Sequence, residues 1–212
     1  MCTGRVDQAF IFRALLNGKD GVLIGGCWPG ECHYLTQGNY GAIRAMHIGK
    51  KLLEWVGLSP ERLRLEFVSA SEGSRYAEVM NDFSKKVKQL GPLGKGEGID
   101  DTTLRRKLEV VYHLVPYIKL VERERLRQRV TSVDAYNEFF AGDEFNKIFK
   151  DLIADKLELG QIMAIVRERP RSAGEISEIL GVTPAEVAIQ LNRSARQGFV
   201  EFDLSQMRFC VV

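Results

Sequence analysis

The chain has 212 residues, a formal net charge of +2 and 27% charged residues, which is ordinary for a globular protein. Its hydrophobic content of 45% suffices for one large domain or two small ones. No apolar run approaches the ~18–20 residues that a membrane helix needs, and the N-terminus lacks the pattern of a signal peptide. We therefore expect a cytoplasmic protein without a membrane span.

The first ninety residues alternate between helical and strand patterns. The expected elements are a helix over 6–17, a strand over 21–25, a helix over 39–57, a strand over 63–68, and a helix that Ser69 and Glu72 open as a capping box. This order predicts an α/β fold with a parallel sheet and crossover helices. Ligands of such sheets bind at the carboxyl ends of strands, where residues 26–34 form a loop.

The rest of the chain is expected to be helical before it ends in a small module. Residues 91–98 hold four glycines and a proline, which indicates a linker. Helical patterns follow over 101–130, interrupted at Pro116, and over 133–156. Helices at about 157–168, 173–180 and 184–197 then precede strands over 198–203 and 206–212, the order of a winged-helix module. We predict domains over 1–91, 92–155 and 156–212.

The cysteine pattern is the main sign of chemistry. Cys27 and Cys32 flank a tight Trp-Pro-Gly-Glu turn with the Cys-x4-Cys spacing that also opens the pattern of plant-type two-iron clusters. His33 follows directly, so a zinc site or a purely structural pair stays open. Cys2 would lie at another strand end if a strand preceded it. Cys210, in an apolar terminal run, is expected to be a small buried hydrophobe.

Four ordered motifs resemble the delta-subunit family of methyl-viologen-reducing hydrogenase. They are Met-Cys-Thr-Gly-Arg-Val-Asp at 1–7, Gly-Gly-Cys-Trp-Pro-Gly-Glu-Cys-His-Tyr at 25–34, Gly-Asn-Tyr at 38–40 and Glu-Phe-Val-Ser-Ala-Ser-Glu at 66–72. The similarity covers about residues 1–91. It implies an incomplete flavodoxin-like parallel sheet, followed here by the helical segment and the winged-helix module.

The resemblance also implies a function. The family passes electrons through a [2Fe–2S] cluster from a hydrogenase or formate dehydrogenase to the flavin subunit of a heterodisulfide-reductase-like complex. By the same resemblance, Cys2, Cys27 and Cys32 are the expected cluster and metal ligands. No catalytic residue is expected, because such a subunit serves an oxidoreductase complex rather than acting as a catalyst on its own.

The sequence departs from the family at its start. The family implies a further strand and a Cys-x-x-Cys-type motif upstream of the position that matches Met1, and a two-iron cluster takes four protein ligands. Three explanations are open: a misassigned start, a partner chain that supplies the missing strand and cysteines, or loss of the cluster. We favour the first two.

Two rival functions follow from other features. A winged-helix module suggests an iron–sulfur redox-sensing DNA-binding regulator, whose recognition helix reads the major groove from its N-terminal end. Residues 184–190 contain one acid and no base, however, and 156–212 contain seven Lys/Arg and seven Asp/Glu. Since DNA affinity depends on positive charge, we expect protein docking rather than nucleic-acid binding. The second rival is a zinc-stabilised scaffold without a redox role.

Overall fold

The computed structural model describes residues 2–128 and 132–212, and the chain divides into two compact units, Met1–Ala154 and Asp155–Val212. The helices and strands of the first unit are η1 (Thr3–Arg5), α1 (Gln8–Leu16), β1 (Val22–Gly26), α2 (Gly38–Val56), η2 (Pro60–Arg62), β2 (Leu63–Phe67), α3 (Gly73–Leu90), α4 (Asp101–Arg125), α5 (Val133–Ala141), α6 (Asp143–Ile148) and the π-helical turn η3 (Phe149–Ala154). Those of the second unit are α7 (Asp155–Glu168), α8 (Ala173–Leu180), α9 (Pro184–Arg196), β3 (Val200–Asp203) and β4 (Arg208–Val211). The division of the chain into three domains stays a prediction.

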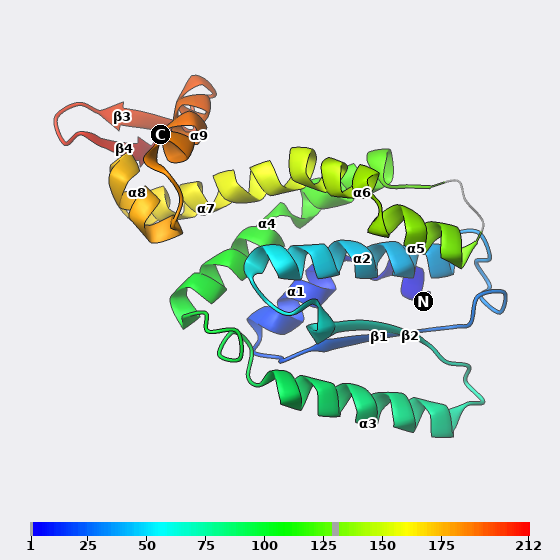
Figure 1. Cartoon of the computed structure of the whole chain (residues 1–212). Coiled ribbons are helices and arrows are strands. Elements are labelled where there is room, and N and C mark those ends of the chain that lie inside the picture. The colour runs from blue at the N-terminus through cyan, green and yellow to red at the C-terminus, as the bar shows by residue number, and fades with distance from the viewer. Residues whose placement is uncertain (1, 129–131) are drawn as a thin grey trace. The chain divides into compact units, whose positions relative to one another are not determined.

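The first unit is built around a parallel pair of strands. β1 and β2 pair in register from Val22 with Leu63 to Gly26 with Phe67, and α2 is the crossover between them. Figure 1 shows α2 and α3 on opposite faces of the pair. The expected mixed α/β architecture is confirmed, mostly helical and with a two-stranded parallel sheet in the described residues. The flavodoxin-like assignment stays a prediction.

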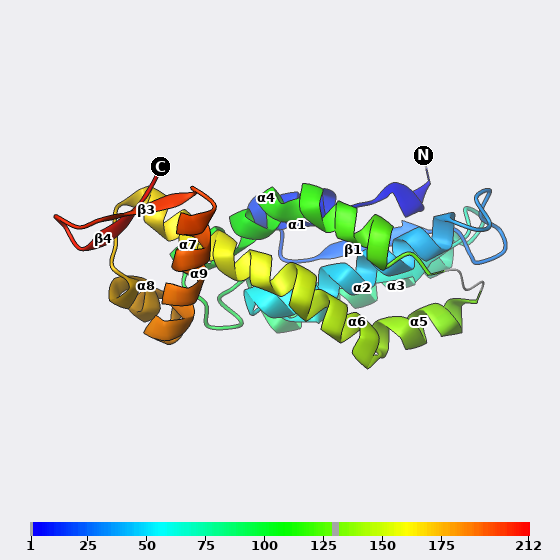
Figure 2. The same ribbon diagram turned by 90° about the horizontal axis from the view of Figure 1, so that it is seen from above.

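Helix α2 carries the core of this unit because its apolar residues recur at helical spacing. Ile48, Leu52 and Val56 are completely buried. The helix ends where Gly57 adopts φ 97°, the left-handed conformation that glycine reaches without steric cost. On the same side of the sheet α1 packs against α4, which runs in front of it in the view of Figure 2.

Two helical stretches differ from the expected pattern. The interruption expected at Pro116 is wrong, because α4 continues through it from Asp101 to Arg125. Pro116 is exposed, so water can satisfy the carbonyl group that loses its helical donor, while Val115 and Ile118 stay buried beside it. The single helix expected over 133–156 is divided at Gly142, whose N–H donates to the Phe139 carbonyl at 3.1 Å.

The glycine-rich segment over 91–98 is anchored by one buried side chain. Arg62 is completely buried, and its guanidinium binds Glu97 through Nε–Oε1 at 2.6 Å and Nη2–Oε2 at 2.8 Å. The guanidinium also donates to the backbone carbonyls of Asp20, Leu90, Gly91 and Pro92. This ion pair, which the sequence did not reveal, ties the segment to the start of β2.

The second unit has its own core. Capping boxes open α8 at Ser172 and α9 at Thr183, and β3 pairs with β4 as an antiparallel hairpin. Its buried residues are Ile162, Ile165, Val166, Ile176, Val187, Leu191 and Val200. The three helices and the hairpin occur in the expected order, and their assignment as a winged-helix module stays a prediction. In the part of the chain that the structure describes, no helix has the length and apolar content to cross a membrane.

Candidate functional site

Three cysteines line one small pocket at the end of β1. Cys2 precedes η1, whereas Cys27 and Cys32 lie in the loop that follows the strand, and the pocket has a volume of about 10 Å³. The sulfur atoms of Cys2 and Cys32 lie 3.8 Å apart although the residues are 30 positions apart in the chain. Cys32 is buried, Cys2 is half-buried and Cys27 is exposed.

Glycines allow the sulfur pair to lie against the start of α2. A Cβ atom at Gly38 would stand 2.4 Å from Cys32 Sγ and 2.9 Å from Cys2 Sγ, closer than real Cβ atoms come. A Cβ atom at Gly4 would stand 2.5 Å from the Gly38 carbonyl oxygen. The Gly4 N–H also donates to Cys2 Sγ at 3.4 Å. The backbone therefore approaches both sulfurs as closely as it does because these two positions have no side chain.

A set of polar contacts holds the cysteine loop. Asn39 Nδ2 donates to the Cys27 carbonyl at 2.6 Å, and Trp28 Nε1 donates to Glu72 Oε2 at 2.6 Å. The Arg75 guanidinium lies over the Trp28 ring, 4.9 Å from its centroid. Both α2 and α3 thus position the loop between Cys27 and Cys32.

Glu72 has a different role from the one expected. Its carboxylate accepts from the Ser69 N–H at 2.7 Å, which is one half of a capping box, but α3 begins only at Gly73, with Glu72 itself as N-cap. The expected helix start at Ser69 is therefore wrong. The bond from the Ser69 N–H, followed by the one from Trp28, lowers the pKa of the Glu72 carboxyl. The Glu72 carboxylate therefore serves to hold Trp28 in place.

Arg5 and His33 lie near the pocket but form no hydrogen bond with the sulfur of Cys2 or Cys32. Arg5 forms no ion pair with Asp7, which instead caps α1 and binds Lys119 Nζ at 2.7 Å. His33 is exposed and meets Tyr34 edge-on. Over residues 2–128 and 132–212, no three His, Cys, Asp or Glu side chains are grouped so as to hold a metal ion.

The donor chemistry nevertheless fits an iron–sulfur cluster. Thiolates are the soft ligands that such clusters and zinc share, and here three thiols line the same pocket. Because residue 38 is a glycine, no side chain occupies the space beside the sulfurs of Cys2 and Cys32. The assignment of Cys2, Cys27 and Cys32 as ligands stays a prediction.

Cys210 is not part of this pocket. It lies on β4 and is only half-buried, so the expectation of a buried hydrophobe is wrong. Its thiol lies 3.7 Å from the Glu201 carbonyl oxygen. Burial, together with the negative charge of Glu201, raises the pKa of this thiol. Cys210 therefore serves as a matched control for changes at the other three cysteines.

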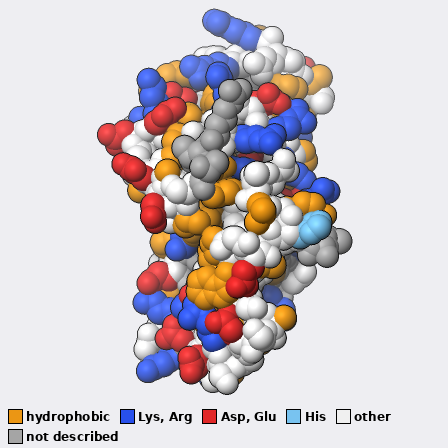
Figure 3. All heavy atoms as spheres, turned by 90° about the vertical axis from the view of Figure 1, so that its right-hand side faces the viewer, with side chains coloured by type: hydrophobic (Ala, Val, Ile, Leu, Met, Phe, Trp, Pro, Cys, Tyr) orange, Lys and Arg blue, Asp and Glu red, His pale blue; other side chains and the backbone are white. Residues whose placement is uncertain are grey.

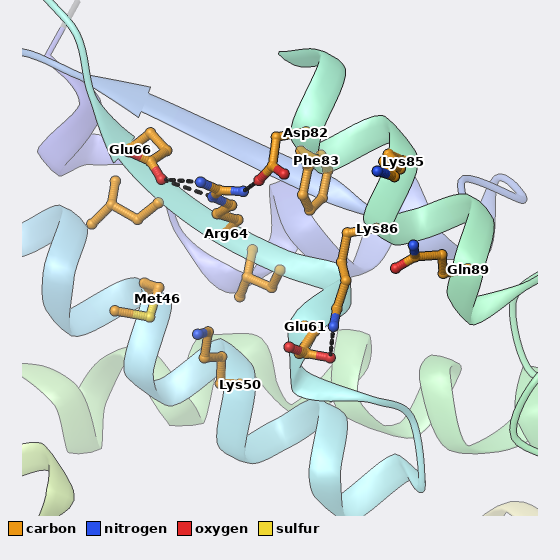
Figure 4. A pocket seen from close by; sticks show the side chains of 12 residues that line it. Met46, Lys50, Glu61, Arg64, Glu66, Asp82, Phe83, Lys85, Lys86 and Gln89 are labelled. Atoms are coloured by element: carbon orange, nitrogen blue, oxygen red, sulfur yellow. Dashed lines mark hydrogen bonds and ion pairs between the residues drawn. The ribbon is translucent and has the colours of Figure 1, made fainter. Parts of the chain in front are cut away.

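A second pocket, of about 540 Å³, lies along the outer edge of β2 between α2 and α3. Figure 4 shows how charged side chains fill it: Arg64 reaches Glu66 and Asp82, and Lys86 reaches Glu61. These charges largely neutralise one another, and charged side chains are a common protection of an unpaired strand edge. We therefore interpret this pocket as a protected edge rather than a site for chemistry.

Comparisons with known proteins concern the part of the chain that contains the three cysteines. Residues 1–91 match the family model for "Methyl-viologen-reducing hydrogenase, delta subunit". The chain is 52% identical over 91 residues to an iron-sulfur subunit of the F420-non-reducing hydrogenase of Archaeoglobus profundus, covering 43% of this chain and 66% of that protein. It is 38% identical over 92 residues to the vhu iron-sulfur subunit of the F420-non-reducing hydrogenase of Methanopyrus kandleri, covering 43% of this chain and 69% of that protein.

The same region also resembles part of a much larger protein. The chain is 44% identical over 94 residues to a subunit of the ferredoxin/F(420)H(2)-dependent CoB-CoM heterodisulfide reductase of Methanosarcina acetivorans, covering 44% of this chain and 12% of that protein. The chain therefore spans about two thirds of the length of the hydrogenase proteins it matches and a small part of the reductase protein.

Proposed function

This chain belongs, through residues 1–91, to the methyl-viologen-reducing hydrogenase delta-subunit family, and from that we propose that it is an electron-transfer subunit of a hydrogenase and heterodisulfide-reductase complex. It relays electrons from a hydrogenase or formate dehydrogenase to the flavin subunit of a heterodisulfide-reductase-like complex. The names of its relatives support this role, because they include iron–sulfur subunits of hydrogenases and one component of a heterodisulfide reductase.

The observation that carries the proposal is the 3.8 Å approach of the Cys2 and Cys32 sulfurs. Two thiols from distant segments, with Cys27 lining the same pocket, suit a shared soft-metal group. We propose that these three residues hold a [2Fe–2S] cluster. When bound, such a cluster supplies one-electron chemistry, accepting and releasing single electrons.

The chain's own residues tune and position this site. The Gly4 N–H donates to Cys2 Sγ, and hydrogen bonds to ligand sulfurs are one of the factors that set cluster potentials. The bond from Asn39 to the Cys27 carbonyl fixes the exposed end of the loop. Gly38 keeps the backbone close enough for both sulfurs to face the same pocket.

A fourth ligand remains to be supplied, since a two-iron cluster takes four. We propose that it comes from a further protein segment, either preceding residue 1 in a longer protein or belonging to a partner chain. The exposure of Cys27 is compatible with this, because that side of the pocket is accessible to another segment.

The proposal is tested on the full chain purified without oxygen, alone and with its flavin-subunit partner. Iron, zinc and acid-labile sulfide are measured per chain, and the reduced protein is examined by electron paramagnetic resonance. We expect a two-iron signal that Cys27→Ser and Cys32→Ser remove and that the control Cys210→Ser leaves intact. A full signal in Cys27→Ser refutes the ligand assignment, and stoichiometric zinc without sulfide refutes the electron-transfer role in favour of the zinc scaffold.

The DNA-binding alternative gains no support from the second unit. The first turn of α9 contains Glu186, and its basic residues Arg193 and Arg196 come in the last turn. A recognition helix presents its N-terminal residues to the bases, so this helix offers the wrong charge at the reading end.

A further inference from the structure

A large cavity lies beside the cysteine pocket and is lined by two different regions of the chain. Its volume is about 1100 Å³. One side is lined by residues around η1 and the first turns of α2, and the other by residues of α4, by Arg127 and Gln128, and by Tyr136 of α5. The first wall lies within residues 1–91, which match the family model, whereas the second lies beyond them. The cavity therefore combines the family region with a part of the chain that the match does not include.

The charges of this cavity are unbalanced. Its lining holds five Lys or Arg residues and two carboxylates. Both carboxylates are already paired, Asp7 with Lys119 and Glu122 with Arg44, each at 2.7 Å.

Of the remaining cations, Arg123 pairs with its neighbour Glu124 on the surface at 2.7 Å. Arg5 and Arg127 form no ion pair with any described residue, and each is exposed. Two free guanidinium groups thus stand on opposite walls of one cavity. We call this surface the basic cavity.

The basic cavity has the composition and exposure of a protein interface. Leu35 and Leu120 are 61% and 47% exposed, and the lining includes Tyr40 and Tyr136, whose rings lie 4.9 Å apart. Arginine and tyrosine are the residues that protein interfaces favour, while a small-molecule site buries most of its ligand's surface. Figure 3 shows the end of the protein where the cysteine loop lies, with hydrophobic side chains down its middle and Lys and Arg side chains near them.

The basic cavity adjoins the paired sulfurs. A smaller cavity of about 320 Å³ is lined by Cys2 and shares Gly4, Arg5 and Gln37 with the basic cavity. A protein seated on the basic cavity would therefore stand next to Cys2, the half-buried member of the sulfur pair.

We infer that the basic cavity is the docking surface for an acidic redox protein, whose carboxylates meet Arg5 and Arg127. The redox purpose of this contact rests on the proposed function, whereas the docking itself rests on charge and exposure. Opposite charges accelerate the encounter of two proteins and fix their relative orientation, and salt weakens this attraction. The contact thus brings a partner's redox centre to the Cys2 side of the pocket.

The test uses an acidic plant-type ferredoxin as the probe and basic cytochrome c as the probe of opposite charge. Binding of each to the full chain is measured by calorimetry at about 50 mM and 500 mM salt, where screening differs strongly. Of the two probes, we expect only the ferredoxin to bind, and we expect it to bind at the low salt concentration. Arg127→Glu, which is distant in sequence from all three cysteines, and Arg5→Glu should each weaken binding about tenfold or more, as losses of close charge pairs at interfaces do.

The matched control is Lys85→Glu at the protected edge of β2, which changes the net charge by the same amount and should leave binding unchanged. The inference is overturned if ferredoxin binds no better than cytochrome c, or if Lys85→Glu weakens binding as much as Arg127→Glu. It is also overturned if FMN or ADP saturates the cavity with an affinity that Arg127→Glu abolishes while ferredoxin does not bind.

Cluster content and binding, measured on the same samples, separate this inference from the proposed function. An unaltered chain that binds ferredoxin but holds no iron and sulfide refutes the proposed function and leaves the docking intact. An unaltered chain that holds the cluster but does not bind ferredoxin refutes the docking alone. The Cys32→Ser variant should lose the cluster and still bind ferredoxin, because the positive charges of Arg5 and Arg127 do not depend on the Cys32 sulfur.

Discussion

At the scale of single residues, the cysteine pocket depends on glycine as much as on sulfur. Cys2 and Cys32 meet because the backbone at Gly38 lies directly against both sulfurs. Gly4, which also has no side chain, lets η1 approach the carbonyl group of Gly38. A side chain at either position would move one sulfur away from the other. The geometry of the pocket is therefore set by two residues that have no ligand chemistry of their own.

Gly38→Ala should separate the two sulfurs and abolish cluster loading. The new Cβ would start 2.4 Å from Cys32 Sγ, so the loop or the helix must shift. Iron and acid-labile sulfide per chain, measured after anaerobic reconstitution, should fall to near zero. Gly73→Ala is the control, because its Cβ meets nothing within 4 Å at the start of α3. Full loading of Gly38→Ala would show that the sulfur pair does not depend on this approach.

The spacing of Cys27 and Cys32 was enough to predict that these residues share a turn, and the family resemblance added Cys2. Neither indicated that Gly38 lies against the sulfurs, because that contact joins segments that are distant in the chain. Glu72 shows the same limit: its capping-box spacing predicted a local bond, whereas its second bond goes to Trp28, 44 residues away. Local pattern identifies candidate residues, and only packing between segments shows which of them meet.

At the scale of elements, the ion pair of Arg62 and Glu97 joins η2 to the segment that precedes α4. Arg62 is completely buried, and the side chain of Glu97 is 14% exposed. Burial alone would raise the pKa of the Glu97 carboxyl, but the hydrogen bonds from Arg62 and from the Ser59 N–H lower it below its ordinary value. The charged form of Glu97 therefore stabilises the folded state.

Glu97→Gln should lower the free energy of unfolding at pH 7 by about 3–5 kcal/mol, because it leaves a buried guanidinium without its carboxylate. The folded-state pKa of Glu97 is depressed, so its contribution is present above its ordinary pKa of 4.5 and is lost as pH falls through the lower folded value. The difference between the variant and the wild type should thus shrink in urea melts performed below pH 4.5.

Glu61→Gln provides the matched control for this measurement. Glu61 pairs with Lys86 at 2.8 Å on the surface, where such pairs contribute about 0–1 kcal/mol. Equal losses in Glu61→Gln and Glu97→Gln at pH 7 would contradict the special role of the buried pair.

Helices and strands were largely predictable from their periodicity, except for the continuity of α4 through Pro116, the division at Gly142 and the start of α3 at Gly73. Proline was expected to interrupt the helix at Pro116, but an exposed proline costs one hydrogen bond while the buried face of α4 keeps its packing. Arg62 gave no signal at all, since a single arginine before a strand is usually solvated. Its burial depends on the carbonyl groups that the glycine-rich segment folds around it.

At the scale of the whole molecule, the chain consists of two units with separate apolar cores. The core of Asp155–Val212 is formed by residues of α7, α8, α9 and the hairpin alone. Two capping boxes fix the starts of α8 and α9, and an isolated bridge joins Arg171 to Phe209 of β4. These contacts are all internal to the unit, so it contains what a small domain needs to fold.

The isolated unit over residues 155–212 should therefore unfold cooperatively when heated, as followed by circular dichroism. Leu191 is completely buried, so Leu191→Ala should cost about 2–5 kcal/mol and abolish the transition or lower its midpoint strongly. Ile189→Ala, which removes an exposed side chain from the same helix, should have little effect. A broad, non-cooperative melt of the unaltered unit would contradict its independence.

The proximity of the paired sulfurs also has a consequence for handling the protein. Cys2 and Cys32 Sγ lie 3.8 Å apart, and they need only close to the ~2.05 Å of a disulfide bond for an oxidant to join them. That reaction removes two electrons and two protons from the thiol pair and withdraws both sulfurs from metal binding together. Air that reaches the metal-free chain would thus join the two sulfurs in a disulfide bond, which a thiol reductant must break before either sulfur can bind a metal ion.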